Sequence, residues 1–461
     1  MSNLDAIVAT VEDAIVPGLG YSLHTQKAAG YVRERNWSTF HPSGSNIYSV
    51  ASGQRVVRFL ISDGGKAMLD LHTLRLNFQI TNTDGANPLY LTGRHPACLF
   101  SRLTVRVAGT QVEDILYYNR LLGMLQNFRT ANAVASEGIM GVGTATNNLT
   151  MTSPGPEAIE PGETLTIVCD LPCGLLNSHY LLPIGRFPLE IQLELVKQAS
   201  DVCMPGPLPG PVNLSTAFTI QNCSIKVDTV SLDSQMNESI DEALLQGKPL
   251  SLSLSTWNNQ YFTLANIAAN AGSWSVLLSR SFSRLQSVFI NFLPAAYAGQ
   301  WTESNMFTCW HGGAAADNVT MPNYNFVRDT FRFQLTAGAH LWPQMPIQSL
   351  AEAYYQLAKC LGQLQSAEGF SVGPLYRSTN FHIGLDLEKM AATPAGTMAF
   401  TGLNTKASND QLRFQFDNVS SDTGNGYLLA RQYAFCHFNT LVELRAEGVI
   451  CADYSNLATE A

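Results

Sequence analysis

One segment of the chain has the residue pattern of a serine nucleophile. Gly369-Phe-Ser-Val-Gly373 matches the GxSxG motif, and Asp386 and His437 follow in the order of a Ser-Asp-His triad. In that motif the serine lies on a sharp turn between a strand and a helix. Here a helical pattern precedes the motif and Pro374 follows it, so no helix can begin there normally. We therefore interpret Ser371 as a loop serine, and the sequence predicts no catalytic residue.

The remaining residues that could bind a metal or a cofactor are scattered. The nine histidines include no HxH or HExxH spacing. His311-Gly312-Gly313 resembles part of an oxyanion loop but lies in a stretch of Ala and Gly. Asp233 and Asp386 are single carboxylates that could cap a loop or bind a structural cation. No glycine-rich phosphate loop is present. We expect no bound metal and no cofactor.

The nine cysteines are irregularly spaced and include no CxxC pair. The two nearest in sequence, Cys169 and Cys173, have no second pair that would complete a zinc site. We expect buried free thiols in a reducing compartment. The first 20 residues lack the basic and apolar regions of a signal peptide, and no apolar run has the length of a membrane span. These features favour a protein of the cytosol or nucleus.

The composition limits the class of protein. Of the 461 residues, 46% are hydrophobic and only 14% are charged, which excludes a disordered chain. A surface with so few charges favours a protein whose faces are covered by other copies. The net charge is −9, so direct, sequence-specific binding to nucleic acid is not expected.

Most of the chain alternates apolar and polar residues with a period of two, which is typical of half-buried antiparallel strands. The clearest strands are at 74–80, 103–107, 189–195, 250–254, 331–335 and 412–416. Helical periodicity is confined to a few segments, at about 3–16, 115–129, 236–246 and 348–366. The first of these is an amphipathic helix that Pro17 and Gly18 end, and a flexible arm follows it to about residue 45.

The two halves of the chain resemble each other. Residues 100–107 match residues 326–333, and each copy is followed by a Tyr-Tyr pair that opens a helix, at Tyr117 and at Tyr354. Three further strands match in the same order: the one ending at Ile80 with 285–292, 167–171 with 383–387, and 225–227 with 442–444. The matches indicate a duplicated domain of many short strands. A jelly roll of about eight strands accommodates each half.

The order of five stretches resembles that of the double jelly-roll major capsid proteins of eukaryotic double-stranded DNA viruses, in particular the polinton-like group and the nucleocytoplasmic large DNA virus lineage. These stretches are Leu99 to Gly109 with the helix after it, Val230 to Ser234 with 244–247, Arg280 to Ile290, Trp342 to Ile347 with the helix after it, and Asp386 to Lys389 with 401–405. The expected fold is all-β, with two tandem eight-stranded jelly rolls, short helices in the connections and an N-terminal helical arm. The expected domains are residues 1–45 for the arm, 46–235 for the first jelly roll and 236–461 for the second.

The resemblance implies a structural protein of the virion and no enzyme. Three chains would form a homotrimer of pseudo-hexameric outline, and such capsomers would tile an icosahedral shell together with penton and minor capsid or cement proteins. The chain would be made in the host cytoplasm and assembled there or in the nucleus; the sequence leaves open whether a membrane lies beneath the shell. Residues 1–30 are expected on the inner side, where they would clamp neighbouring capsomers or minor proteins.

Two other functions stay open at this point. The strands also suit a β-sandwich module that binds a receptor or a glycan without forming a shell, with Trp301 and Trp310 as stacking residues. An enzyme that uses Ser371 is the third hypothesis.

Overall fold

The computed structural model covers the full chain and describes thirteen segments of it. The described residues are 32–65, 67–91, 95–129, 140, 158–203, 214–263, 273–294, 332–338, 340–362, 382–388, 402–406, 411–417 and 429–451.

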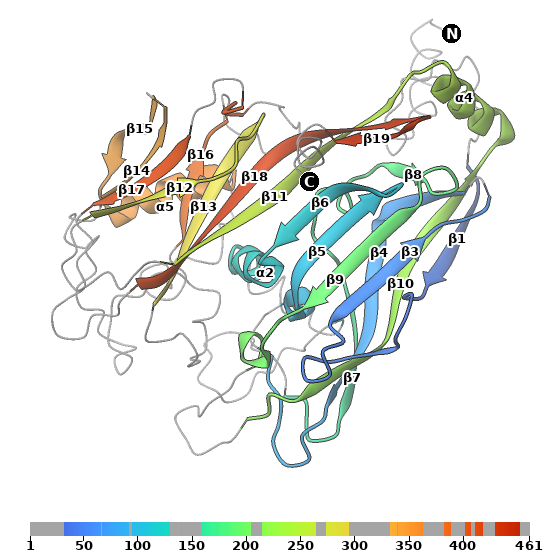
Figure 1. Ribbon diagram of the computed structural model, residues 1–461, viewed down its shortest axis with the longest axis horizontal. Coiled ribbons are helices and arrows are strands. Elements are labelled where there is room, and N and C mark those ends of the chain that lie inside the picture. The colour runs from blue at the N-terminus through green and yellow to red at the C-terminus, as the bar shows by residue number, and fades with distance from the viewer. Residues whose placement is uncertain are drawn as a thin grey trace, which may run out of the picture.

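The N-terminal half forms two antiparallel sheets that enclose one core (Figure 1). The first sheet has the strand order β1-β10-β4-β7, with the short β2 on β10 and β8 on β4; the second has the order β3-β9-β5-β6. Their bounds are β1 Val32–Phe40, β2 Ile47–Tyr48, β3 Val56–Ile61, β4 Ala67–Asn82, β5 Phe100–Val107, β6 Thr110–Leu116, β7 Thr164–Cys169, β8 Leu181–Pro183, β9 Leu189–Leu195 and β10 Phe218–Leu232.

The C-terminal half repeats this arrangement beside the first (Figure 1). One sheet has the order β11-β18-β13-β16, with β19 added on β18, and the other has the order β12-β17-β14-β15. Their bounds are β11 Leu250–Thr263, β12 Ser273–Leu278, β13 Leu285–Pro294, β14 Arg332–Ala337, β15 His340–Ile347, β16 Ile383–Asp386, β17 Leu412–Asp417, β18 Leu429–Arg445 and β19 Gly448–Cys451.

Taken along the chain, the eight main strands of each half pair in the same pattern. The first, eighth, third and sixth form one sheet, and the second, seventh, fourth and fifth form the other. This is the connectivity of a jelly roll, so the predicted double jelly roll is confirmed. The arm, however, is shorter than expected: Val32 to Phe40 form β1, which pairs with β10 from Ile225 to Leu232. The first jelly roll therefore begins before residue 46.

The predicted repeat holds for elements but not always for residues. The hairpin partners Val107 with Thr110 and Ala337 with His340 give the equivalence of β5 and β14, so Val107 corresponds to Ala337 and not to Phe333. A shift by an even number of residues leaves the alternation of apolar and polar side chains unchanged, so periodicity alone could not fix the register. The two Tyr-Tyr pairs also differ in place, because Tyr117 precedes its helix whereas Tyr354 lies inside its own.

Within the described residues, three α-helices lie in the connections, as the sequence predicted. They are α2 Tyr118–Asn127, α4 Ser234–Leu245 and α5 Leu350–Cys360. The Ser349 side chain accepts a hydrogen bond from the Glu352 backbone N–H, and the Glu352 carboxylate accepts one from the Gln348 N–H, which together satisfy free donors at the start of α5. The expected helix at 3–16 lies outside the described residues.

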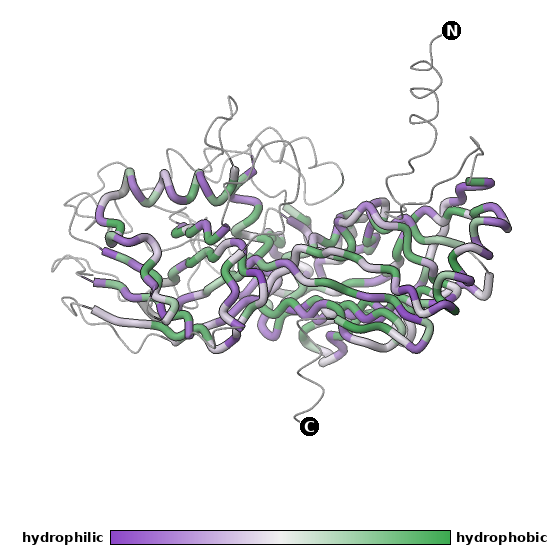
Figure 2. Tube along the Cα trace, turned by 90° about the horizontal axis from the view of Figure 1, so that it is seen from above, coloured by the Kyte–Doolittle hydropathy of each residue, from purple (hydrophilic) through white to green (hydrophobic). Residues whose placement is uncertain are grey.

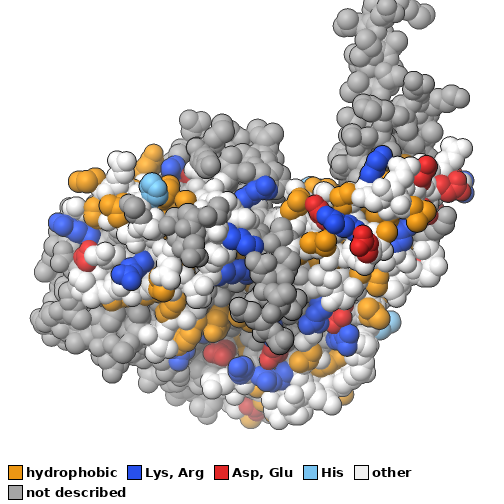
Figure 3. Space-filling model, turned by 45° about the horizontal axis from the view of Figure 1, so that its top comes forward, with side chains coloured by type: hydrophobic (Ala, Val, Ile, Leu, Met, Phe, Trp, Pro, Cys, Tyr) orange, Lys and Arg blue, Asp and Glu red, His pale blue; other side chains and the backbone are white. Residues whose placement is uncertain are grey.

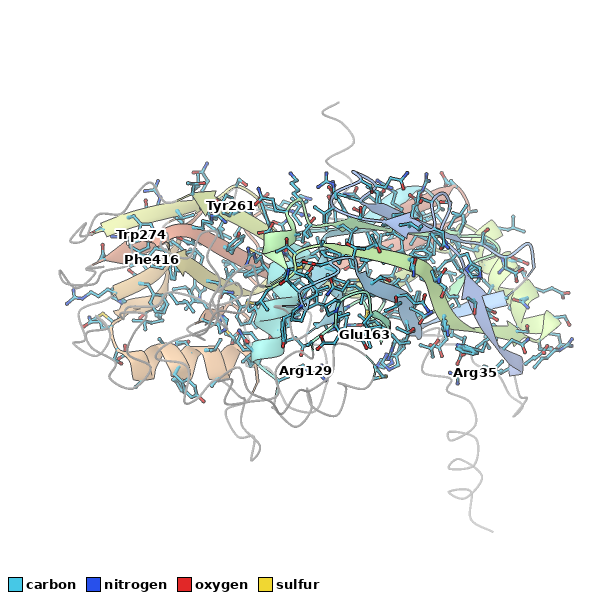
Figure 4. The ribbon with its side chains drawn as sticks, turned by 90° about the horizontal axis from the view of Figure 1, so that it is seen from below. Arg35, Arg129, Glu163, Tyr261, Trp274 and Phe416 are labelled. Atoms are coloured by element: carbon cyan, nitrogen blue, oxygen red, sulfur yellow. The ribbon has the colours of Figure 1, made fainter. Side chains whose placement is uncertain are left out.

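The buried apolar side chains of the two jelly rolls form one continuous cluster. Hydrophobic and hydrophilic residues alternate along many of the strands that supply it (Figure 2). In the second jelly roll, Trp274 of β12 stacks on Phe416 of β17 at 4.8 Å between ring centroids (Figure 4). Two strands depart from alternation: β13 and β18 are buried on both faces, as Val288, Phe289 and Ile290 of β13 illustrate. Their outer face must therefore be covered by another part of the chain. Within the described segments, no helix is long and apolar enough to cross a membrane.

Candidate functional site at the junction between the two jelly rolls

The residues of the proposed triad do not assemble in the part of the chain that the structure describes. Ser371 lies outside it. Asp386 and His437 are both paired with Ser287 of β13, one on each side. They are thus two strand spacings apart, roughly 10 Å, whereas the Asp of a triad contacts its His directly. Burial lowers the pKa of His437 to about 4, and its ring stacks on Trp257 at 4.4 Å.

The two single carboxylates have structural roles. Asp233 precedes α4 and accepts a hydrogen bond from the Gln235 N–H, and the Arg33 guanidinium bound to it lowers its pKa. Asp386 accepts from the Glu388 N–H at 3.0 Å and lies 3.6 Å from the Lys359 ammonium. Both therefore cap local backbone, one of the two roles that the sequence allowed. No group of three His, Cys, Asp or Glu side chains among the described residues is placed to hold a metal ion.

Two further predictions concern residues that the structure describes only in part. Trp301, Trp310 and His311 all lie outside the described residues. Of the nine cysteines, the eight described ones are free thiols, and all but Cys360 are buried. Burial raises the pKa of the Cys98 thiol to about 12, so this thiol stays protonated and unreactive at neutral pH.

The junction between the two jelly rolls begins where β6 ends. β6 packs against β11 and β19 of the second half. The Asn259 side-chain amide donates to the Leu116 carbonyl at 2.7 Å. The next residue, Tyr117, has a left-handed backbone with φ of 51°, and α2 starts directly after it. This turn directs the chain from the edge of the first jelly roll onto the outer face of the sheet that contains β11.

Aromatic rings cover the centre of the junction. The Tyr117 ring lies 5.6 Å from the Tyr261 ring and 5.5 Å from the Tyr433 ring, and the two latter rings are 5.2 Å apart. The Arg120 guanidinium lies 5.8 Å from the centre of the Tyr433 ring. Tyr261 is labelled in Figure 4, in the same half of the molecule as Trp274 and Phe416. Such ring clusters contribute both buried area and preferred edge-to-face geometry.

The end of α2 inserts polar groups into this junction. His382 is fully buried, and burial lowers its pKa to about 3, so the ring is neutral. Its Nδ1 lies 2.9 Å from the Asn291 Oδ1, and its Nε2 lies 3.4 Å from the Asn127 Nδ2. Because an amide oxygen can only accept and an amide nitrogen can only donate, the ring carries its proton on Nδ1. Phe128 packs on His382 and Phe289, at 5.0 and 5.7 Å between centroids.

A close backbone approach completes the junction. The Glu113 carboxylate of β6 accepts hydrogen bonds from the N–H groups of Gly174 and Leu175, at 2.9 and 3.0 Å. A Cβ atom at Gly174 would lie 2.4 Å from the Ser255 carbonyl oxygen of β11. Only glycine allows the two backbones to approach this closely. The junction is therefore hydrogen-bonded and closely packed, and it holds the two jelly rolls in one relative orientation.

No sequence motif marks these junction residues. The available signal was indirect: strands β13 and β18 carry Asn291 and Asn439 amid apolar residues, where alternation fails. A strand that is apolar on both faces has to be covered twice. That pattern predicts a second layer but does not identify it, because Tyr117 and Phe128 lie more than 100 residues away from the strands that they cover.

No family model matches the chain, and neither does any curated protein. Among solved structures, a chain of the PBCV-1 virus capsid has a TM-score of 0.61 at 13% identity, covering 93% of this chain and 99% of that one. The Faustovirus major capsid protein has a TM-score of 0.58 at 10% identity, covering 95% and 96%.

A third structure, that of the Sputnik virophage, has a TM-score of 0.57 at 11% identity, covering 96% of this chain and 93% of the chain that it matches. In all three cases the match spans both jelly rolls and nearly the whole of each chain. The chain therefore has the double jelly-roll fold that these viral capsid proteins share.

Proposed function

We propose that the chain is a structural major capsid protein whose homotrimers are pseudo-hexameric capsomers of an icosahedral virion shell. The observation that carries this proposal is the fixed junction between two jelly rolls of the same connectivity. Two similar jelly rolls held side by side present nearly equivalent lateral faces. Three such chains would provide six jelly rolls. A six-barrel ring tiles a flat facet with one kind of contact.

The surface supports this role. Lys and Arg side chains are scattered among uncharged ones over the face in Figure 3, and only 14% of all residues are charged. Uncharged faces pack against neighbours at a low desolvation cost. The partners would be further copies of the chain, neighbouring capsomers, and penton and minor capsid or cement proteins. The acidic net charge of −9 speaks against direct, sequence-specific nucleic-acid binding.

The test is the assembly state of the purified chain. We expect trimers by light scattering after size exclusion, and negative-stain images of hexagonal particles that form sheets or shells at high concentration. A monodisperse monomer at high concentration, with neither trimers nor sheets, would overturn the proposal.

A structural role also predicts no covalent catalysis. A fluorophosphonate probe should leave Ser371 unlabelled under native conditions, in the intact chain and in assembled particles alike. Labelling of Ser371 that a Ser371→Ala variant abolishes would favour the hydrolase hypothesis instead.

A further inference from the structure

The internal duplication shows which surfaces the junction leaves unused. At the junction, the fifth main strand of the first half (β6) and its following helix (α2) cover the outer face of the sheet β11-β18-β13-β16. The corresponding elements of the second half are β15 and α5, and the corresponding sheet of the first half is β1-β10-β4-β7. One side of α5 already packs on β16 of its own half, so the surface left uncovered consists of β15 and the opposite, exposed side of α5. β15 and β1 lie at opposite ends of the long axis of the molecule (Figure 1). The β15 edge and the β1 face therefore cannot contact each other within one chain.

The first unused surface is apolar and exposed. In β6, Val112 and Ile115 are fully buried. In β15, Met345 is 75% exposed and Leu341 is 47% exposed, and on α5 Tyr355 is 54% exposed. β15 is also an edge strand, since its pairing is with β14 alone among the described strands. Large apolar side chains gathered on an exposed edge are typical of a surface that another chain covers.

The second unused surface lies on the outer face of β1, β10 and β4. Trp37 of β1 is 69% exposed, with the Lys226 ammonium 5.0 Å from its ring centre. Arg35, on the same strand, is labelled at that end of the molecule in Figure 4.

Next to Trp37, this face carries charged side chains that already pair with one another. Asp228 is the strand partner of Trp37, and the Arg35 guanidinium contacts the carboxylates of both Asp228 and Asp70. Further along the face, uncharged side chains also pair, as the Thr81 and Thr164 hydroxyls do at 2.8 Å. Covering this face therefore leaves few polar groups without a partner, and the large exposed Trp37 ring is of the type that anchors protein interfaces.

We propose that β15 and α5 of one chain cover the β1-β10-β4 face of a second copy, and so repeat between chains the contact that β6 and α2 make within one. The inference rests on the proposed function, and it specifies which surfaces build the trimer. The contact is head-to-tail, so each added copy leaves the same two surfaces free until the assembly closes. A closed ring of three chains would alternate internal and intermolecular junctions.

The first test replaces Trp37 with the photo-crosslinking amino acid p-benzoyl-L-phenylalanine. Irradiated trimers should yield covalently linked chains whose crosslinked peptides lie in 340–360. The matched control places the same amino acid at Leu60, which is 53% exposed on β3 of the other sheet, and it should give no link to 340–360. Trimers that crosslink from Trp37 to other segments would overturn the inference while leaving the proposed function in place.

The second test blocks each surface separately. Trp37→Glu and Met345→Glu should each raise the trimer dissociation constant by about tenfold or more, whereas Leu60→Glu should leave it unchanged. Each variant's monomer should keep its melting temperature, since these side chains are exposed. Should Met345→Glu misfold, Leu341→Ser tests the same surface.

A mixture of the two variants tests whether the contact between chains is head-to-tail. Trp37→Glu keeps the β15 surface and Met345→Glu keeps the β1 face, so a mixture should form a heterodimer through the one intact pair and should not close into trimers. A heterodimer absent from the mixture, although the wild type forms trimers, would contradict a head-to-tail contact. A wild type that forms no trimer at all would instead overturn the proposed function.

Discussion

At the scale of single residues, the junction depends on a position where no side chain fits. A Cβ atom at Gly174 would lie 2.4 Å from the Ser255 carbonyl oxygen and 2.7 Å from the Glu113 carboxylate. We expect Gly174→Ala to lower the free energy of unfolding by about 1–3 kcal/mol, because the backbone has to shift away from β11. Urea unfolding measures this. Gly85→Ala is the control, since no atom lies within 4 Å of its Cβ position. Equal effects of the two substitutions would contradict a close approach at the junction.

One buried histidine, His382, and one half-buried histidine, His437, make stability depend on pH. Burial lowers the pKa of His382 to about 3 and that of His437 to about 4, against about 6.5 in an unfolded chain. Between these values the unfolded chain binds more protons, so stability falls as the pH drops from about 6.5 towards 4. Each histidine contributes a slope of about 1.4 kcal/mol per pH unit.

The variant His382→Gln isolates one of these contributions. Glutamine keeps an amide donor and acceptor near Asn127 and Asn291 but does not titrate. Urea titrations between pH 6 and 4 should therefore show a slope that is smaller by about 1.4 kcal/mol per pH unit than that of the wild type. His437→Gln, on the far side of β13 from Asp386, should reduce the slope similarly. An unchanged slope in His382→Gln would mean that the ring is accessible to water.

At the scale of elements, the sequence predicted most strands and helices because their periodicity is local. The alternation in β4, β9 and β17 and the helical spacing in α4 and α5 depend only on one buried face. The register of the repeat could not be obtained in this way, since Val107 matches Phe333 and Ala337 equally well by pattern. The start of the first jelly roll was misplaced for another reason: β1 is exposed along most of its length, so it carries no apolar alternation.

The C-terminal turn of α2 is the element that joins the two cores. Phe128 packs on Phe289 of the second jelly roll while its helix belongs to the first. We expect Phe128→Ala to destabilise the chain by about 2 kcal/mol and to reduce the cooperativity between the halves. Scanning calorimetry should then resolve two transitions in place of one.

The control for this substitution is Leu277→Ala, an exposed apolar residue on β12 away from the junction. It should leave the thermal transition unchanged. A Phe128→Ala protein that still unfolds in one transition with the enthalpy of the wild type would mean that the junction is held elsewhere, for example by Tyr117 and Tyr433.

At the scale of the whole molecule, the sequence predicted the duplication of the domain but not the contacts between the two domains. Five matched segments in one order predict two similar domains. How two domains contact depends on a few side chains from distant segments, such as Asn127 and His382, and no pattern in either segment indicates its partner. Comparing the two jelly rolls in three dimensions shows which sheet face is covered in one jelly roll and exposed in the other. The sequence alone does not contain this information.

The boundary of the arm gives a test on the whole chain. β1 begins at Val32, so deleting residues 1–30 leaves all its pairs with β10 intact, whereas deleting residues 1–45 removes the strand and its Trp37. If the arm acts between capsomers, the shorter deletion should keep the melting temperature and the trimer but impair shell assembly. The longer deletion should lower the melting temperature and also abolish trimers, because it removes part of the proposed intermolecular face.

Light scattering and negative-stain images of both deletion variants measure their trimer formation and shell assembly. Loss of the trimer in the shorter deletion would place the arm within the trimer, and intact trimers in the longer one would exclude β1 from its interface.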